Sequence, residues 1–550
     1  MTKIQDKQIN NSLKEIEEIT SKILASTSSR KLIVAGPGTG KTTFFRKIIT
    51  SKNNSRNNFL VLTFINTLEA ELEKELGDIA KIYTFHGYCH SLLRKYSDLR
   101  SGLTAEFEYY PPLVELIKSD SRILTKTQEA PEFINEMRNL TGTNPKYYLK
   151  RGNYYNAVGY DDSIYRVNKA VDDGIHLNEN YELIVVDEYQ DFNLLETKVL
   201  GKLSESNNIL IAGDDDQALY CDLRGSDPNY IRRLWGTSDY EKFELPLCFR
   251  STKAIVMFFN YFLDIVKAKD YLKGRIDKRF LPSPTKESDN TDYPSVKVVT
   301  TSIQKKKSDT NYFGRYILNE LEKVKSKEIS ESHEKGFPTV LIIGASHYLN
   351  SISSYFEENN INFERRKSEG GLTINIEDGL KLLKTDKNTN LAWRIILESV
   401  KPSFYEEIIN KTFSDNPSLI DLIPDEFSAK YLKLAQKFEI QEEVKTESEV
   451  DKTKPLIKLT SFEGAKGLSA HHVFIVGLQD SILPKDANKI RDIEISKFLV
   501  ALTRARKQCH LLSTYRFAGV STTPSKFVTW VTSTKIPQVE VINIDKDYWK

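Results

Sequence analysis

The chain has 550 residues, of which 39% are hydrophobic and 28% are charged, and its net charge is +2. This length exceeds what one hydrophobic core organises, so we expect several domains of a water-soluble, globular kind. The small net charge excludes a global electrostatic attraction for nucleic acid, which would have to bind in a local groove. The four cysteines form no Cys-x-x-Cys pair, and no apolar run approaches the roughly 20 residues of a membrane span. These features predict a cytoplasmic protein that has no membrane partner.

Short apolar runs rich in β-branched residues alternate with helical patterns along the chain. This alternation predicts an α/β fold with parallel sheets flanked by helices. The runs fall into two groups, before about residue 215 and after about residue 295, which predicts two α/β lobes. Two segments, about 95–180 and about 380–453, break the alternation, and we interpret them as insertions. The runs are 31–35, 59–63, 183–186, 209–212, 340–343, 472–476 and 510–512.

The first run leads into Ala35–Thr43, whose sequence AGPGTGKTT is that of a phosphate-binding loop. Its glycines let the backbone curl until N–H groups point at phosphate oxygens. Lys41 would reach the β- and γ-phosphates, and the Thr42 hydroxyl would ligate Mg²⁺. The helix that follows would direct its positive end at the same anion, so the loop predicts binding and hydrolysis of ATP or GTP. The predicted nucleotide-binding residues of the loop are Gly36, Pro37, Gly38, Thr39, Gly40, Lys41, Thr42 and Thr43.

Two later runs end in acidic sequences that complete such a site. The run 183–186 is followed by Asp187, placed to hold Mg²⁺ through water, and by Glu188, placed to orient or deprotonate the attacking water. A capping acidic cluster after a strand is the alternative. The run 209–212 leads to Gln217, whose amide is suited to bond the γ-phosphate or the water. By itself an acidic turn of this kind is a weak signal.

Two arginines have the surroundings expected of catalytic groups. Arg250 and Arg504 each follow apolar residues and have a Ser or Thr beside them. Arginine stabilises the negative charge that spreads in a phosphoryl-transfer transition state. Each arginine alone would suit a surface salt bridge better, and only the ensemble favours catalysis. The predicted catalytic residues are Glu188, Gln217, Arg250 and Arg504.

The order of these motifs resembles that of superfamily one DNA helicases of the UvrD/Rep type, over nearly the whole chain. The resemblance implies two RecA-like lobes, 1A and 2A, with ATP and Mg²⁺ between them, a helical insertion 1B and a reduced insertion 2B. It places motif I at 35–43, Ia at 61–66, Ib at 84–87, II at 187–191, III at 213–220, IV at 247–251, V at 464–468 and VI at 502–505.

The resemblance also implies a domain division and an activity. The activity is ATP-dependent translocation on single-stranded DNA, usually 3′ to 5′, with strand separation at duplex junctions. By position, Phe249 and Gly467 join the nucleotide site, Phe249 in place of the tyrosine that stacks on adenine. The DNA contacts would be Thr63, Phe64, His86, Tyr220 and Arg224. The implied division is 1–94, 181–290 (motifs II, III and IV) for lobe 1A, 95–180 for 1B, 291–380 and 454–550 for lobe 2A, and 381–453 for the 2B-like segment with a charged linker.

Several positions depart from the family pattern. The upstream glutamine that reads the adenine edge has no match, and Thr20 lies near its place, which leaves the preference for ATP over other triphosphates open. Cys221-Asp222-Leu223 stands where the family has a base-stacking tryptophan, and Glu463 and Ser469 replace motif V residues. These changes and the short 2B-like segment predict weaker base stacking and less processive unwinding.

The departures motivate a second hypothesis. The chain would then be a DNA-gated ATPase sensor with little unwinding of its own, in a complex with a nuclease partner, as in anti-phage systems. After motif VI there is no Asp…Glu-x-Lys nuclease pattern, so a separate protein would cut the DNA. An RNA helicase is a third interpretation, disfavoured because Asp187–Asp191 resembles the DNA branch.

Two further clusters allow more than one interpretation. Lys146–Arg151, together with Tyr154 and Tyr155, interleaves basic and aromatic residues, which suits a nucleic-acid surface or a tyrosine-rich helix packed on its own lobe equally well. The pair His471-His472 precedes a strand without other ligands nearby, and we interpret it as structural.

Overall fold

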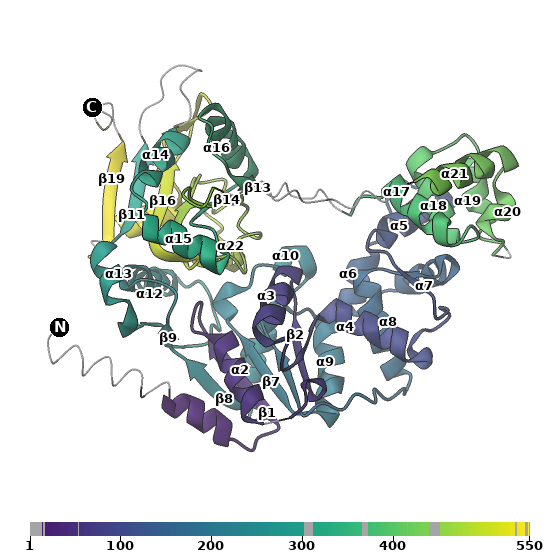
Figure 1. Cartoon of the computed structure of the whole chain (residues 1–550), viewed down its shortest axis with the longest axis horizontal. Coiled ribbons are helices and arrows are strands. Elements are labelled where there is room, and N and C mark those ends of the chain that lie inside the picture. The colour runs from purple at the N-terminus through teal and green to yellow at the C-terminus, as the bar shows by residue number, and fades with distance from the viewer. Residues whose placement is uncertain are drawn as a thin grey trace.

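The computed structural model describes residues 14, 17–52, 54–301, 312–365, 372–414, 416–438, 451–533, 536–544 and 548. Two parallel sheets organise two lobes, and a group of helices extends from one side of them (Figure 1). The predicted α/β class with two lobes is therefore confirmed. Within these residues, no helix combines the length and apolarity needed to cross a membrane.

The first sheet has six parallel strands. The phosphate-binding loop follows β1, and the acidic motif follows β6, two strands away in the sheet. Because all strands run the same way, both motifs leave the sheet at the same edge, where ligands of open α/β sheets bind. In sheet order the strands are β3 (Lys81–Thr84), β2 (Phe59–Thr63), β6 (Leu183–Val186), β7 (Ile209–Gly213), β1 (Arg30–Ala35) and β8 (Glu241–Leu245).

Both faces of this sheet are buried. Along β1, Leu32 and Val34 join one hydrophobic cluster, while Ile33 and Ala35 join a second cluster on the other face. This alternation follows from the two-residue period of a strand, and the double burial explains why the runs are apolar throughout. The helices and turns of this lobe are α2 (Lys41–Ser51), η1 (Arg56–Asn58), α3 (Asn66–Leu76), α4 (Phe85–Lys95), η3 (Tyr189–Asp191), α9 (Leu194–Ser206), η4 (Asp215–Gln217), α10 (Cys221–Arg224) and α11 (Asn229–Gly236).

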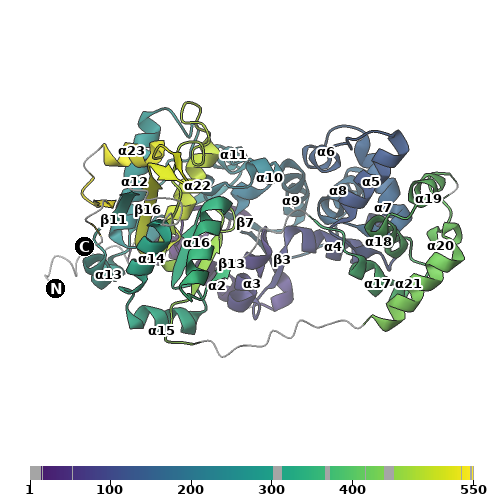
Figure 2. The same ribbon diagram turned by 90° about the horizontal axis from the view of Figure 1, so that it is seen from above.

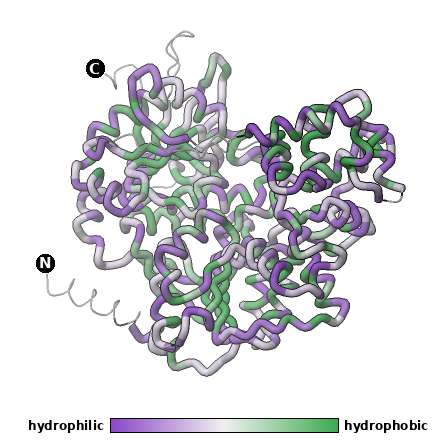
Figure 3. The backbone as a smooth tube through the Cα atoms, turned by 45° about the vertical axis from the view of Figure 1, so that its right-hand side comes forward, coloured by the Kyte–Doolittle hydropathy of each residue, from purple (hydrophilic) through white to green (hydrophobic). Residues whose placement is uncertain are grey.

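The second sheet has seven parallel strands and is likewise covered on both faces. Figure 3 shows hydrophobic segments gathered inside the lobes. In sheet order the strands are β13 (Glu364–Arg365), β14 (Ile457–Thr460), β12 (Val340–Ile343), β15 (Ala470–Ile475), β16 (Ala505–Thr514), β11 (Val296–Thr301) and β19 (Val539–Ile544). The other elements here are η5 (Pro284–Lys286), α13 (Glu287–Asp292), α14 (Tyr312–Leu321), α15 (Ser326–Lys335), α16 (Ser346–Glu358), α22 (Asp492–Leu502), β17 (Arg516–Phe517), β18 (Val520–Ser521) and α23 (Lys526–Thr532).

The chain crosses between the lobes earlier than the predicted division at residue 290. Helix α12 (Lys253–Ala268) buries Phe258, Phe259 and Phe262 in the same core as strands of the second sheet. The chain then returns, and Ile276 packs in the core of the first sheet before β10 (Leu281–Pro282) pairs with β9 (Leu247–Cys248). We therefore propose that α12 belongs to the second lobe, because its apolar face is completed there.

The two insertions share one hydrophobic core, here called the insertion core. It includes Leu116 and Phe133 from the first insertion and Trp393, Ile396 and Tyr431 from the second. Both views place the two groups of helices side by side (Figures 1 and 2). The elements are η2 (Ser97–Leu99), β4 (Glu108–Tyr109), α5 (Leu113–Thr125), α6 (Phe133–Asn139), α7 (Asn144–Tyr155), β5 (Ala157–Val158), α8 (Tyr160–Asp172), α17 (Ile376–Thr385), α18 (Asn390–Val400), α19 (Tyr405–Lys411), α20 (Leu419–Leu422) and α21 (Asp425–Lys437).

A buried ion network lies within the insertion core. The Asp120 carboxylate accepts bonds from Arg151 and from Arg394, each at 2.8 Å, and Arg394 also pairs with Glu398 at 2.9 Å. Arg151 further stacks on the ring of Tyr154 at 4.7 Å. Arg151, Tyr154 and Tyr155 of α7 thus pack in the insertion core, which favours the packing interpretation for these residues, whereas Lys146 and Lys150 are exposed to solvent.

Candidate nucleotide site between the lobes

The phosphate-binding loop connects β1 to α2 in a tight turn. Gly38 and Gly40 have positive φ values of 69° and 81°, which side chains with a Cβ adopt only at a cost. A Cβ on Gly38 would also lie 2.4 Å from the Cβ of Arg250. Both the positive φ and this close approach therefore require glycine at position 38. The Thr39 hydroxyl donates to the Gly36 carbonyl at 2.9 Å and closes the turn.

The acidic motif after β6 faces this loop. The Lys41 ammonium lies 2.8 Å from Glu188 Oε1 and 3.9 Å from Asp187 Oδ1. Glu188 has a φ of 55°, a left-handed conformation that is strained for a residue with a side chain and is typical of functional sites. Gln190 donates to the second Glu188 oxygen at 2.6 Å and thereby helps to orient the carboxylate.

Charge pairing sets the ionisation of these groups. Burial alone would lower the pKa of Lys41, but Glu188 and Asp187 outweigh it and raise that pKa. Burial likewise opposes ionisation of Glu188, yet Lys41 and Lys466 hold its pKa well below the usual range. Lys41 is therefore a cation and Glu188 an anion at neutral pH, which are the forms that phosphate binding and water orientation require.

Lys466 from the second lobe enters the same site, and the sequence analysis missed it. Its ammonium pairs with Asp191, lies 3.2 Å from Glu188 Oε2 and donates to the Gln217 carbonyl at 3.1 Å. Only 5% of the residue is exposed. The signal that could have found it is its place directly before Gly467 in motif V.

Gln217 and the two arginines meet at the interface of the lobes. Arg504 donates to Gln217 Oε1 at 2.9 Å, while Gln217 itself donates to Asp214 at 2.7 Å. Burial and then the nearby Arg250 lower the pKa of Arg504 to about 9. Burial also lowers the pKa of Arg250. The pocket lining includes Lys41, Arg250, Lys466 and Arg504 together with Glu71, Asp187 and Glu188, so basic side chains only slightly outnumber acidic ones. The two guanidinium groups can pair with a polyphosphate.

These residues line one pocket of about 140 Å³. A hydroxyl and a carboxylate in it, Thr42 and Asp187, form an oxygen donor set that fits Mg²⁺. Glu71 of α3 also lines it and was not predicted. Phe249 and Thr43 line a second pocket beside the loop. The residues around the first pocket are Gly36, Pro37, Gly38, Thr39, Gly40, Lys41, Thr42, Leu68, Glu71, Asp187, Glu188, Gln217, Arg250, Lys466, Gly467 and Arg504.

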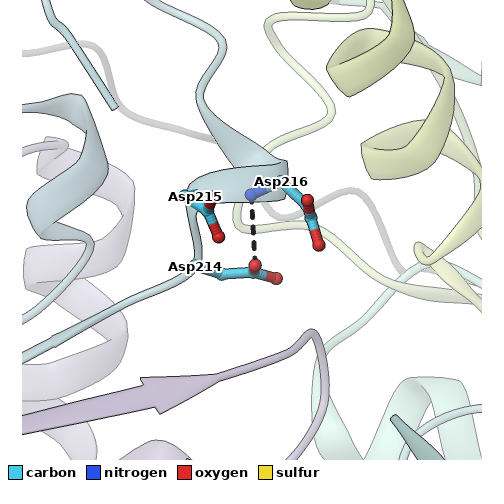
Figure 4. Close-up of side chains that lie close together, drawn as sticks. All are labelled: Asp214, Asp215 and Asp216. Atoms are coloured by element: carbon cyan, nitrogen blue, oxygen red, sulfur yellow. Dashed lines mark hydrogen bonds between the residues drawn. The ribbon is translucent and has the colours of Figure 1, made fainter. Parts of the chain in front are cut away.

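Three consecutive carboxylates stand next to Gln217 (Figure 4). The Asp214 carboxylate accepts from the Asp216 backbone N–H at 3.2 Å. The Lys278 ammonium lies 2.8, 2.6 and 2.8 Å from Asp214, Asp215 and Asp216, and Arg275 pairs with Asp216 at 2.7 Å. Lys278 and Arg275, which follow α12, thus balance the charge of the three carboxylates. We interpret these ion pairs as fixing the position of the turn that carries Gln217.

The residues predicted to contact DNA form one cluster on the first lobe. Phe64 and Tyr220 lie with ring centroids 5.2 Å apart, and the Arg224 guanidinium lies 3.7 Å from the Phe64 centroid. Arg224 also lies 3.3 Å from the His86 ring and 2.5 Å from Glu196. Thr63, Phe64 and His86 are buried, so these side chains pack against one another as much as they form a surface. Their role in DNA contact stays a prediction.

Comparisons with known proteins agree with this arrangement. A family model described as an AAA domain matches residues 19–222, and a model of the UvrD-like helicase C-terminal domain matches residues 418–515. The two matches contain the phosphate-binding loop, the acidic motifs and Arg504. In its C-terminal part the chain is thus similar to UvrD-like helicases. The expected resemblance is thereby confirmed.

Individual relatives of the chain are distant in sequence. The chain is 27% identical over 294 residues to the ATP-dependent DNA helicase PcrA of Staphylococcus epidermidis. The aligned stretch covers 45% of this chain and only 40% of the length of that relative. Two proteins described as "Probable DNA helicase II homolog" match more fully. The one from Mycoplasma capricolum is 24% identical over 87% of this chain and 81% of its own length. The one from Mycoplasma pneumoniae is 22% identical over 93% and 86%.

Proposed function

We propose that this chain is an ATP-dependent DNA helicase that translocates on single-stranded DNA. The observation that carries the proposal is a pocket between the lobes, to which both lobes contribute. Lys41, Glu188 and Gln217 come from the first lobe, and Lys466 and Arg504 come from the second. A site completed by both lobes couples their approach to nucleotide chemistry, which is what a motor needs. The relatives named as DNA helicases support the choice of DNA as the track.

In this proposal each residue has a distinct task. The loop N–H groups and Lys41 hold the phosphates, and Glu188 orients the attacking water and accepts its proton. Arg250 and Arg504 stabilise the charge that develops on the transferred group, and Gln217 positions Arg504. Mg²⁺ held by Thr42 and Asp187 would neutralise phosphate charge. Breakage of the β–γ bond then weakens the interactions that hold the lobes together.

The cluster around Phe64 and Tyr220 is the proposed DNA surface. Tyr220 of the first lobe forms a hydrogen bond to the second lobe, in which its hydroxyl donates to the Glu463 carbonyl at 3.4 Å. A change at the nucleotide site would therefore be transmitted to this surface. Stacking of bases on aromatic rings tolerates any sequence, which suits a translocase. By analogy with the family we propose 3′ to 5′ movement.

The test measures ATP hydrolysis and strand separation by the full chain. Steady-state hydrolysis is recorded without nucleic acid, with single-stranded DNA and with single-stranded RNA, at fixed moderate salt. Strand displacement is then compared on duplexes with a 3′ or a 5′ tail. We expect stimulation by DNA more than by RNA, and displacement from the 3′ tail.

Other outcomes would redirect the proposal. Hydrolysis that DNA stimulates without displacement on either tail would favour the DNA-gated sensor, for which the short 2B-like segment is the motivating feature. A hydrolysis rate that no nucleic acid changes would contradict a motor function.

A further inference from the structure

A third carboxylate lines the phosphate pocket and comes from a different element than the other two. Glu71 lies in α3, whereas Asp187 and Glu188 follow β6. Both of those carboxylates pair with Lys41. No hydrogen bond or ion pair joins the Glu71 carboxylate to any other residue that the structure describes. Because the pocket has a volume of only about 140 Å³, the groups on its wall face one another across a short space.

The two arginines on this wall likewise have no carboxylate partner among the described residues. Arg250 forms no ion pair there, and the hydrogen bonds of the Arg504 guanidinium go to uncharged oxygens. The two lysines of the pocket, in contrast, both pair with Glu188. The pocket thus brings an unpaired carboxylate of the first lobe together with the two guanidinium groups that are suited to bind a phosphate.

These three groups influence one another's ionisation. Burial raises the pKa of Glu71, while Arg250 and Arg504 act in the opposite direction. Glu71 in turn favours the charged forms of both arginines, whose pKa values are lowered by burial. The Glu71 side chain is also exposed to solvent, so this attraction is partly screened. An anion that enters the pocket therefore competes with Glu71 for the same two guanidinium groups.

The packing of α3 keeps this carboxylate at the pocket. Leu72 and Leu76 of the helix are buried in the core on one face of the first sheet. The Glu69 carboxylate, in the first turn, accepts a hydrogen bond from the Thr84 backbone N–H at 3.1 Å. A helix anchored at both of these places does not withdraw when a ligand arrives, so a bound phosphate has to lie close to the negative charge of Glu71.

We infer that Glu71 is a positioning residue that limits the affinity for the terminal phosphate of ATP, because its carboxylate attracts Arg250 and Arg504 in the nucleotide-free enzyme and repels the phosphate that replaces it. The inference rests on the proposed nucleotide hydrolysis. In the reaction cycle this carboxylate favours departure of inorganic phosphate once the β–γ bond has broken, because it is the counter-ion that returns to the two arginines. It weakens binding of ATP more than binding of ADP, since only ATP brings the phosphate that meets both arginines.

The experiment measures equilibrium binding of ADP and of adenylyl imidodiphosphate, a non-hydrolysable analogue of ATP, to the full chain with Mg²⁺. Glu71→Gln removes the charge and keeps the shape, and we expect it to tighten binding of the analogue by about three- to tenfold. Binding of ADP should change by less than about twofold, because ADP lacks the phosphate that competes with Glu71. Glu75→Gln, an exposed residue one turn further along α3, is the matched control and should change neither affinity.

Two results would overturn the inference. One is an affinity for the analogue that Glu71→Gln leaves unchanged or weakens, and the other is an equal gain in affinity for ADP and for the analogue. Glu71→Ala, which removes the whole carboxylate group, should reproduce the selective gain, and thermal melting checks that each variant is folded. Because binding is measured without turnover, a chain that binds ATP but does not hydrolyse it would refute the proposed function, while the two affinities would still decide the role of Glu71.

Discussion

The insertion core and the pocket between the lobes both bury arginines, yet their electrostatics are opposite. In the insertion core, Arg394 is paired with Asp120 and Glu398, and although burial opposes its charge these partners raise its pKa. In the pocket, burial and the neighbouring Arg250 lower the pKa of Arg504. Carboxylates thus balance the positive charge of Arg394 in the insertion core, whereas Arg504 in the pocket lies beside a second cation, Arg250.

This difference separates structural charge from functional charge. A buried ion pair with every partner present holds helices of two insertions in one arrangement. Buried cations that repel each other make the fold less stable and are retained where they meet an anionic ligand.

The largest effect is expected at the centre of the pocket. Lys41→Ala and Glu188→Gln should each lower ATP turnover by about a thousandfold or more, because they remove the phosphate contact or the proton acceptor. Steady-state hydrolysis measures the loss, and circular dichroism should show an unchanged fold. Lys202→Ala, which removes an exposed lysine of α9, is the control. Normal turnover in either variant would refute the assignment of the site.

The insertion core should respond in stability and not in chemistry. Arg394→Met leaves Asp120 as a buried charge with one cation fewer, which should cost about 3–5 kcal/mol of unfolding free energy in that region. Hydrogen exchange of α5, α7 and α18 measures this loss locally.

Two results complete this test of the insertion core. Lys411→Met, at an exposed pair of the same insertion, should have almost no effect. Basal hydrolysis should survive Arg394→Met below its melting temperature, and protection in the three helices equal to that of the wild type would show that the network is not stabilising.

Lys466 shares a feature with each region, because it is paired with carboxylates as Arg394 is and lines the nucleotide pocket as Arg504 does. Its pairing with Asp191 and Glu188 across the lobes should orient the catalytic carboxylate. We expect Lys466→Met to lower kcat by about a hundredfold while KM for ATP changes little, since the phosphate contacts remain. Single-turnover hydrolysis separates this loss from slow product release. A rise in KM without a change in kcat would assign Lys466 to nucleotide binding.

The smallest effect concerns His86, a buried histidine that lies beside Arg224. Burial, and then Arg224, lower the pKa of His86 to about 3 in the folded protein, against 6.5 for an unperturbed histidine. Between these values the unfolded chain binds a proton that the folded chain does not, so stability is present above pH 6.5 and falls as the pH drops below it. From pH 7 to pH 5 the loss should be about 2 kcal/mol.

Urea unfolding at the two pH values tests this expectation. His86→Gln should show a smaller difference between pH 7 and pH 5 than the wild type, and the exposed His176→Gln is the control. A pH dependence that His86→Gln leaves unchanged would place the titrating groups elsewhere.

Much of the phosphate side of the site was predictable because its chemistry is local. A strand, a glycine turn and a lysine at the start of a helix are contiguous in Ala35–Thr43, and Asp187 and Glu188 directly follow a buried strand. Parallel strands bring such ends to one edge, so the sequence alone indicates that they meet. The division at residue 290 stays a prediction, and the sequence could not show that α12 packs against strands of the second sheet, because its apolar face would suit either core.

The α/β class and the likeness to UvrD-like helicases could be predicted from the sequence, since both depend on short motifs and strand periodicity. Only the tertiary structure decided which distant groups pair. Lys466 meets Asp191, which precedes it by 275 residues, and Arg394 meets Asp120 across the two insertions. Burial and partner geometry set the ionisation and the hydrogen bonding of these groups, and neither can be read from residue spacing along the chain.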